Sequence, residues 1–226
     1  EKELRREPAD AFGGPDCAHD SFTDTQKAIS YSMTSFFTTG GIRGGKKKLD
    51  KFYPRSFNMG IRRDVNERLG GFSKMRFGED IDFSLRLIEG GHSTALIQEA
   101  FVYHKRRVDF RKFFKQVHNS GIARIHLETR HPGSTRLVHL LPALFTIASV
   151  IALFLCVGRL GLLALAVIFF IDAYHRAGRS VEVALLAVPA CFIQLWGYGS
   201  GFLRAWWGKY ILRSKEFIAF KDNFYE

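Results

Sequence analysis

Long stretches without charged side chains dominate the carboxyl-terminal half of the chain. Residues 137–157 and 183–203 each contain 21 consecutive residues without Asp, Glu, Lys or Arg, and a shorter apolar run lies between them. A helix rises about 1.5 Å per residue, so about 20 apolar residues cross the hydrocarbon core of a bilayer. The pattern predicts transmembrane helices at about 137–157, 160–174 and 183–203, and residues 137–226 are expected to form an all-α transmembrane region with a basic tail.

Basic residues give conflicting orientations for the later spans. Two groups follow the second and third apolar stretches: His175, Arg176 and Arg179, and then Lys209, Arg213 and Lys215. The positive-inside rule places both groups on the cytoplasmic side, which three complete spans cannot achieve. Either the third segment is re-entrant or interfacial, or the tail is exported despite its charge. Three spans are the working interpretation.

The upstream residues, 1–130, alternate between short strand-like and helix-like segments, which indicates an α/β fold. Glycine pairs end two predicted helices, at residues 62–69 and 79–89. Three strands are expected, at residues 56–59, 94–97 and 101–104. The Gly- and Lys-rich segment 38–48 is predicted to be a mobile loop.

Composition narrows the class of protein. The 33 Lys and Arg residues outnumber the 22 Asp and Glu residues, giving a net charge of +11, and they concentrate just before the first apolar stretch. A basic segment next to an apolar stretch is typical of a protein that binds a membrane surface. The three cysteines have neither a disulfide pattern nor a zinc spacing, which favours a reducing, cytosolic face. The chain begins with Glu and has no early apolar run typical of a signal peptide, so we expect it to begin inside a longer protein.

The clearest chemical signal is a pair of acids at the start of the helix predicted for residues 79–89. Glu79 and Asp80 follow Gly78 and occupy the first turn, where the helix dipole and the unpaired backbone amides stabilise a carboxylate. An ionised acid in this place can accept a proton from a substrate hydroxyl. The alternative is that both acids only cap the helix, as acids in first turns usually do.

The same helix contains residues with other expected roles. Its apolar face is expected to comprise Ile81, Leu85 and Ile88. Asp82 lies four residues before Arg86, so the two are expected to form an ordinary surface ion pair. The acidic triplet at residues 80–82 matches a metal-binding pattern of many sugar transferases, but residues two apart on a helix point in different directions, so it is not expected to clamp a metal ion.

Four segments, taken in order, resemble the downstream half of the family 2 glycosyltransferases of the GT-A fold. They are FGGPD at residues 12–16, SFNMGIRRDVNERLGGF at 56–72, GEDIDFSLRL beginning at Gly78, and the dipeptide Tyr103-His104. In that family the first segment follows the metal-binding acidic motif, the second lies beside the donor sugar, and the third carries an acid pair whose second member is the catalytic base. The resemblance covers residues 10–130 and implies a partial GT-A-like, Rossmann-like catalytic domain, which we place at residues 1–130.

The resemblance implies roles for the acids and the histidine. Asp80 would deprotonate the acceptor hydroxyl, and Glu79 would position the acceptor or the sugar. His104 would bind a divalent metal, Mg²⁺ or Mn²⁺, that bridges the diphosphate of the donor in the complete enzyme. The simpler alternative for His104 is a surface or packing histidine.

Five residues are candidate substrate-binding residues: Asn58, Gly60, Gly78, Arg106 and Arg107. Asn58 and Gly60 would line the sugar pocket. The simpler alternative for Gly60 is a turn glycine that needs no ligand to explain it.

The sequence departs from the family in two respects. These 226 residues lack the upstream strand–helix–strand region that recognises the nucleotide, so this chain alone is expected to be inactive. They also lack the QxxRW motif of processive synthases, which favours transfer of a single sugar, although Gln116 lies where a divergent version could occur.

A basic segment at residues 105–130 connects the two predicted parts. Its first eleven residues carry six positive charges around three phenylalanines, and they predict a basic amphipathic helix at the lipid headgroups, where each charge contributes about 1 kcal/mol near anionic lipid. Alternatively, the phenylalanines pack on the protein. Nucleic-acid binding is not expected, because the segment adjoins a membrane span. Arg43 and Lys46–Lys48 would either grip a phosphate group or form a solvated loop.

The function expected from the resemblance is transfer of a sugar, with inversion, from a nucleotide-sugar donor to a lipid-linked or surface-glycan acceptor. The protein is expected to be integral to a membrane, best matched by a bacterial inner (plasma) membrane, with its catalytic domain in the cytoplasm. The alternative is a non-catalytic, membrane-anchored module that binds anionic lipid or a partner protein. A small transporter is disfavoured, because among the acids of the apolar half only Asp172 and Glu182 lie near the ends of the predicted spans.

Overall fold

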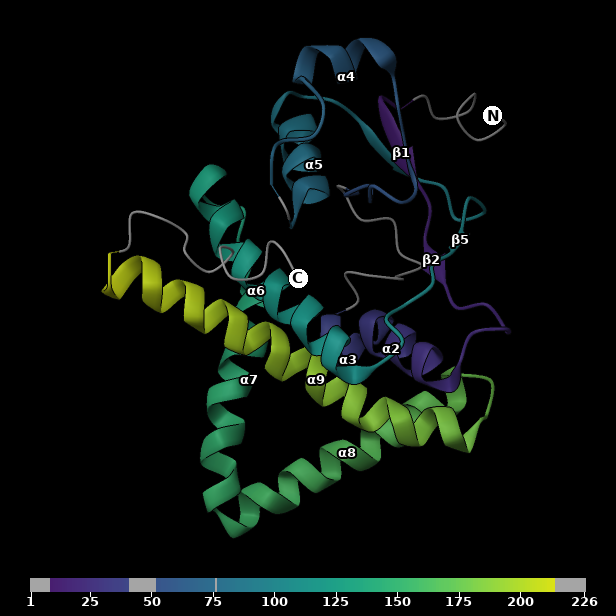
Figure 1. Ribbon diagram of the computed structural model, residues 1–226, viewed down its shortest axis with the longest axis vertical. Helices are drawn as coiled ribbons and strands as arrows, with labels where there is room; N and C mark the ends of the chain where they lie inside the picture. Colours follow the sequence, from purple (N-terminus) through teal and green to yellow (C-terminus); the bar gives the residue numbers. More distant parts are fainter. Residues whose placement is uncertain (1–8, 41–51, 76, 214–226) are drawn as a thin grey trace. The chain divides into compact units, whose positions relative to one another are not determined.

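The computed structural model describes residues 9–40, 52–75 and 77–213 of the chain (Figure 1). The chain divides into two compact units. The first comprises Glu1–His19 and Arg43–His104, and the second comprises Asp20–Ile42 and Lys105–Glu226. These units do not follow the predicted division at residue 130, because residues 20–42 and 105–130 group with the apolar helices.

The first unit contains a small mixed sheet. Strand β1 (Ala11–Gly13) lies between β3 (Met59–Ile61), which is antiparallel to it, and β4 (Thr94–Leu96), which is parallel to it. Strands β2 (Asp16–Cys17) and β5 (Val102–Tyr103) form a separate parallel pair. The strand predicted at residues 56–59 is displaced: Arg55–Asn58 form a turn, and the strand begins at Met59.

Two helices, α4 (Arg63–Leu69) and α5 (Glu79–Glu89), accompany this sheet, close to their predicted bounds. The core between helices and sheet is formed by Ala11, Val65, Phe83 and Leu87. The predicted apolar face of α5 is therefore wrong in part. Leu85 is buried, but Ile81 and Ile88 are only half-buried, because the helix turns Phe83 and Leu87 toward β1.

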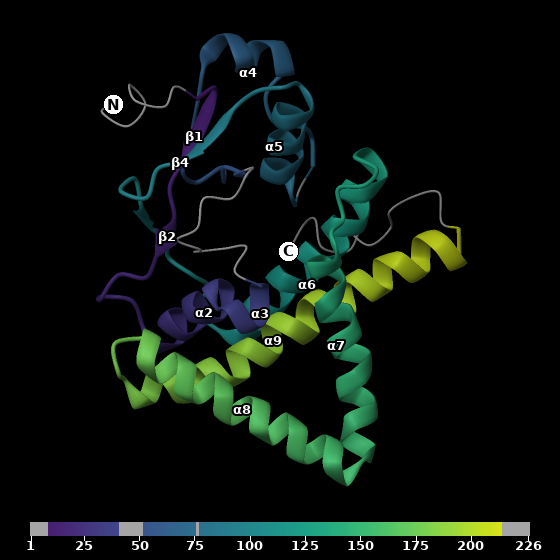
Figure 2. The same cartoon turned by 180° about the vertical axis from the view of Figure 1, so that it is seen from behind.

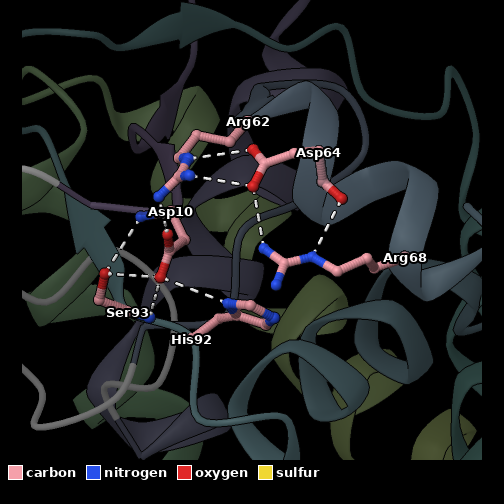
Figure 3. A network of polar contacts seen from close by, with 6 residues as sticks. All are labelled: Asp10, Arg62, Asp64, Arg68, His92 and Ser93. Atoms are coloured by element: carbon pink, nitrogen blue, oxygen red, sulfur yellow. Dashed lines mark hydrogen bonds and ion pairs between the residues drawn. The ribbon is translucent and has the colours of Figure 1, made fainter.

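A polar network holds one end of the sheet together (Figure 3). Asp10, which directly precedes β1, accepts hydrogen bonds from Ser93 N and from Arg62 Nη1, both at 2.9 Å, and His92 Nδ1 lies 3.4 Å from its Oδ2. The backbone hydrogen bond from Ser93 is the main cause that lowers the pKa of Asp10. The network continues over α4 through Arg62, Asp64 and Arg68.

The second unit is helical. Its elements are α2 (Asp24–Thr34), α3 (Phe36–Thr39), α6 (Phe110–Arg130), α7 (Leu137–Phe154), α8 (Cys156–Arg176), α9 (Val181–Trp206) and a short π-helical turn, η1 (Trp207–Ile211). Among the described residues, three helices are long and apolar enough to cross a membrane: α7, α8, and α9 continued through η1. This confirms three apolar helices, although the second begins earlier than predicted, at Cys156. Of the predicted loop 38–48, Thr38 and Thr39 belong to α3, and residues 41–48 lie outside the described residues.

Glycines allow α6 and α9 to pack closely. A Cβ atom on Gly121 would lie 2.1 Å from the carbonyl oxygen of Tyr198, and one on Gly201 would lie 2.0 Å from the carbonyl oxygen of His118. Side chains cannot occupy such distances, so the two backbones are in direct contact at these positions. Figure 2 shows α6 lying against α9 from the opposite side to Figure 1.

Helix α2 covers the first half of α9. Ala28 and Tyr31 belong to one buried cluster with Ala184 and Ala187 of α9. The hydroxyl group of Tyr31 also donates to Asp172 Oδ2 of α8 at 2.6 Å. Helix α2 is therefore bound to two of the three apolar helices.

Candidate functional site

Asp80 lies in the first turn of α5, as the sequence predicts. Gly78 precedes the helix with a φ of 83°, a left-handed conformation that favours glycine. Asp80 Oδ2 lies 3.4 Å from Arg55 Nη1, and the two side chains are 15% and 21% exposed. Asp80 Oδ1 accepts a hydrogen bond from Ile81 N at 2.8 Å. Arg55, which sequence reasoning did not single out, therefore orients the candidate base.

Glu79 has a different environment from its neighbour. Burial raises the pKa of Glu79, and the adjacent charge of Asp80 raises it further. Asp80 lies beside the guanidinium group of Arg55, whereas the raised pKa of Glu79 means that it is ionised less easily than an exposed glutamate. Adjacent acids in such different environments are suited to different tasks, one to accepting a proton and the other to positioning a hydroxyl group.

The turn Arg55–Asn58 connects two parts of the candidate site. Asn58 N donates to Arg55 O at 2.8 Å, which closes the turn. On one side, Ser84 of α5 donates its hydroxyl hydrogen to Pro54 O at 3.1 Å. On the other side, Asn58 Nδ2 donates to Ala100 O at 2.7 Å. The Asn58 amide therefore anchors the turn, a role that sequence reasoning did not assign to it.

His104 contacts the turn Arg55–Asn58 through Phe57. Its ring packs against the ring of Phe57, with a centroid distance of 4.2 Å, and its Nδ1 lies 3.9 Å from Asp16 Oδ2. Parallel pairing of β2 and β5 produces this proximity, because it places Asp16 opposite Val102 and leaves His104 just past the strand end. His104 is thus partly covered by an aromatic ring and adjacent to a carboxylate.

Gly60 lies inside β3 rather than in a turn. It is paired with Phe12 of β1, and a Cβ atom on Gly60 would lie 2.2 Å from the Phe12 ring. Gly14 is similarly restricted, since its Cβ would lie 1.8 Å from Ala100 O. Packing against aromatic and backbone atoms therefore explains both glycines without a ligand.

Asp82 differs most from the sequence prediction. Its Oδ2 accepts from Arg86 Nε at 3.1 Å, so the predicted pair exists, but the Asp82 side chain is 0% exposed. Arg86 also donates to Leu69 O at 2.6 Å and to Gly71 O at 2.7 Å. The expected surface ion pair is instead a partly buried connection between α5 and the end of α4. The helical periodicity could not show this, because the covering residues come from another element.

Arg106 and Arg107 belong to the second unit, whereas Asp80 belongs to the first. Arg106 is buried, and its carbonyl oxygen accepts from Gln26 Nε2 at 3.0 Å. Arg107 Nε donates to Gln116 Oε1 at 3.2 Å. Gln116 therefore stabilises the beginning of the basic segment. Residues 43 and 46–48, the other basic candidates, lie outside the described residues.

His104 and Asp16 are the described residues that the metal expected from the resemblance would have to use. The described residues contain no group of three or more His, Cys, Asp or Glu side chains that could hold a metal. His104 and Asp16 provide two donor atoms on neighbouring segments. Mg²⁺ is usually bound by one or two protein carboxylates, with substrate phosphates and water completing its coordination. Asp16 provides one such carboxylate, and within the part of the chain that the structure describes no third His, Cys, Asp or Glu side chain joins it and His104 in a metal-binding group.

Comparison of the sequence with models of known protein families found no match. Comparison with curated proteins also found no significant match. The functional assignment therefore depends on the residues of the site and on the sequence resemblance.

Proposed function

We propose that this chain contains the acceptor-side part of a membrane-bound, inverting glycosyltransferase similar to family 2. The Arg55–Asp80 pair is the observation that supports this most directly. It provides a partly buried carboxylate at the start of a helix, oriented by a guanidinium group. The turn that supplies Arg55 also supplies Phe57, which packs on His104 beside Asp16.

In the proposed reaction, Asp80 accepts the proton of an acceptor hydroxyl group as its oxygen attacks the anomeric carbon of a nucleotide sugar. The bond from that carbon to the diphosphate breaks on the opposite face, the nucleoside diphosphate leaves, and the configuration inverts. An alcohol is a poor nucleophile until its proton is removed, and a positioned base contributes about 10²- to 10⁴-fold to such a step. Glu79 positions the acceptor hydroxyl.

His104 and Asp16 are the residues that would hold Mg²⁺ or Mn²⁺ in the complete enzyme. The ion would neutralise charge on the leaving diphosphate. The acceptor is a lipid-linked or surface glycan at the cytoplasmic face of a membrane, which the three apolar helices support by providing membrane association.

The test is a transfer assay in membrane vesicles on the protein expressed with any residues that its gene encodes before Glu1. Radiolabelled nucleotide sugars are supplied, and incorporation into lipid and glycan fractions is measured. Asp80→Asn is expected to lower turnover at least 100-fold, within the range of general-base catalysis. Glu89→Gln, at the other end of α5, is the matched control and is expected to retain activity.

Two outcomes would contradict the proposal. One is unchanged turnover in Asp80→Asn protein. The other is absence of transfer from every nucleotide sugar, combined with salt-sensitive binding of the folded protein to anionic vesicles. The second outcome would favour the non-catalytic, lipid-binding module, for which the exposed Arg111, Lys112 and Lys115 of α6 are the supporting observation.

A further inference from the structure

The three apolar helices differ in how much of their surface other helices cover. Helix α7 has two buried residues, Ala143 and Ser149, and α8 also has two, Phe169 and Ala173. Eleven residues of α9 are buried, and they are distributed from Val183 to Ala205. All residues of these three helices are described. Most of the large apolar side chains of α7 and α8 are therefore exposed and available to lipid, whereas α9 packs mainly against protein.

Besides α7 and α8, two helices that carry polar and charged residues, α2 and α6, also cover α9. Helices α6 and α9 run parallel and are in contact along their lengths. Phe113 shares a buried cluster with Ala190, and Ile125 shares another with Ala205. The parallel contact continues to the ends, where Lys209 Nζ contacts the Thr129 hydroxyl group. Helix α6 therefore packs against α9 from the middle of α9 to its end.

Helix α6 is unsuited to the bilayer interior. Arg111, Lys112 and Lys115 are exposed on either side of the buried Phe113, beside the middle of α9. Further along, Arg124 is only 6% exposed within the same unit. If α9 crossed the membrane, its middle and these cations would lie together near the bilayer centre. Charged side chains at that depth are costly, and their cost is lowest at the interface.

The contacts of the first half of α9 also argue against its crossing the bilayer. It is covered by α2, which begins with a polar capping box formed by Thr23 and Gln26. A crossing α9 would carry α2 to one membrane surface and the end of α6 to the other. Residues 105–109, which lead into α6, would then lie at membrane depth, and they include Lys105, Arg106 and Arg107.

We propose that α9 does not cross the membrane. It lies at the cytoplasmic surface together with α2 and α6, and the α7–α8 hairpin is the element that enters the bilayer. Figures 1 and 2 agree that α7 departs from the α6–α9 pair and that α8 returns to the beginning of α9. Both ends of α9 then lie on one side of the membrane.

This arrangement removes the conflict between the basic groups. Arg176 and Arg179 precede α9, and Lys209 and Arg213 follow it. With α9 at the surface, all four are cytoplasmic, as the positive-inside rule requires. Trp206, Trp207 and Tyr210 are exposed at the end of α9, where aromatic side chains are typical of the headgroup level. The surface formed by α6 and α9 thus fits an anionic lipid bilayer.

The experiment compares the two ends of α9 by cysteine labelling in intact bacterial cells that express the full protein. The background carries Cys17→Ser and Cys156→Ser and keeps Cys191, which is 0% exposed. His175→Cys and Leu212→Cys, both at exposed positions, are introduced singly. A membrane-impermeant maleimide is applied before and after permeabilisation, with a host protein that has an external cysteine as the positive control.

We expect both positions to be protected in intact cells and both to be labelled after permeabilisation. Labelling of Leu212→Cys in intact cells with protection of His175→Cys would show that α9 crosses the membrane and would overturn the proposal. Labelling of both positions in intact cells would overturn the cytoplasmic assignment. Each variant is also recovered from alkali-washed membranes, and its thermal transition in detergent must match that of the background protein before its labelling is compared.

Discussion

The Asp82 carboxylate has no exposed surface, and it accepts a hydrogen bond from Arg86 one helical turn later, at 3.1 Å. The arginine in turn donates to two carbonyl oxygens at the end of α4, those of Leu69 and Gly71. Arg86 therefore links this buried acid, which lies two residues after the candidate catalytic base, to the end of α4. Removing one partner of a buried ion pair is costly because the other charge remains desolvated.

Asp82→Ala is expected to destabilise the first unit by about 3 kcal/mol, since Arg86 would lose its buried partner. Hydrogen exchange of the α5 amides in the full chain is the measurement, and their protection should fall. Asp64→Ala is the matched control. It removes an exposed ion pair with Arg68 of the same sequence spacing and a second exposed pair with Arg62, and α5 protection should not change. Equal protection in both variants would show that the Asp82 contact is not structural.

Gly201→Ala should separate α6 from α9, because the added methyl group would lie 2.0 Å from His118 O. We expect a loss of about 1–3 kcal/mol in unfolding free energy, which is typical of overpacking. Thermal unfolding of the full chain in detergent measures it. Gly161→Ala on α8 is the control: its methyl group would meet nothing within 4 Å, so stability should be retained or increase slightly. A lower transition temperature for Gly161→Ala than for Gly201→Ala would contradict this assignment.

Acid should weaken the end of the sheet at Asp10. The pKa of this residue is lowered in the folded protein, mainly by the backbone hydrogen bond from Ser93. A lowered folded-state pKa contributes stability above the unfolded-state value, about 3.9 for an aspartate, and that contribution disappears as the pH falls through the folded-state pKa. Asp10→Asn should therefore reduce the dependence of β1 and β4 amide protection on pH in this acidic range. An identical pH dependence in the two proteins would exclude Asp10 as the cause.

Under the proposed function, Arg55→Gln should lower the rate of sugar transfer by about 10- to 100-fold, less than Asp80→Asn, because Arg55 acts only through the orientation of the carboxylate. The double variant should be no slower than Asp80→Asn alone, since residues that act through one contact are not additive. Transfer rates of the four proteins provide this cycle. Fully multiplicative losses would show that Arg55 has a separate function.

Several features could be predicted from the order of residues alone. Stretches without charge indicated three apolar helices. A helix that is surrounded by lipid or by apolar side chains cannot include unpaired charges. Gly78 and Gly90 indicated the limits of α5, and Asp80 was correctly placed in its first turn. These properties are local: they depend on backbone conformation and on residues within one or two turns.

The tertiary structure decided which of those faces meet other elements. Arg55, the partner of Asp80, lies 25 residues upstream, and no periodic pattern connects the two. The apolar face of α5 was displaced toward Phe83 and Leu87, and Asp82 became buried, because the covering surfaces come from α4 and β1. For α9, length and composition indicated a span, but its contacts with α2 and α6 are the basis for placing it at the membrane surface. Periodicity identifies the residues that share a face, whereas only packing identifies what covers that face.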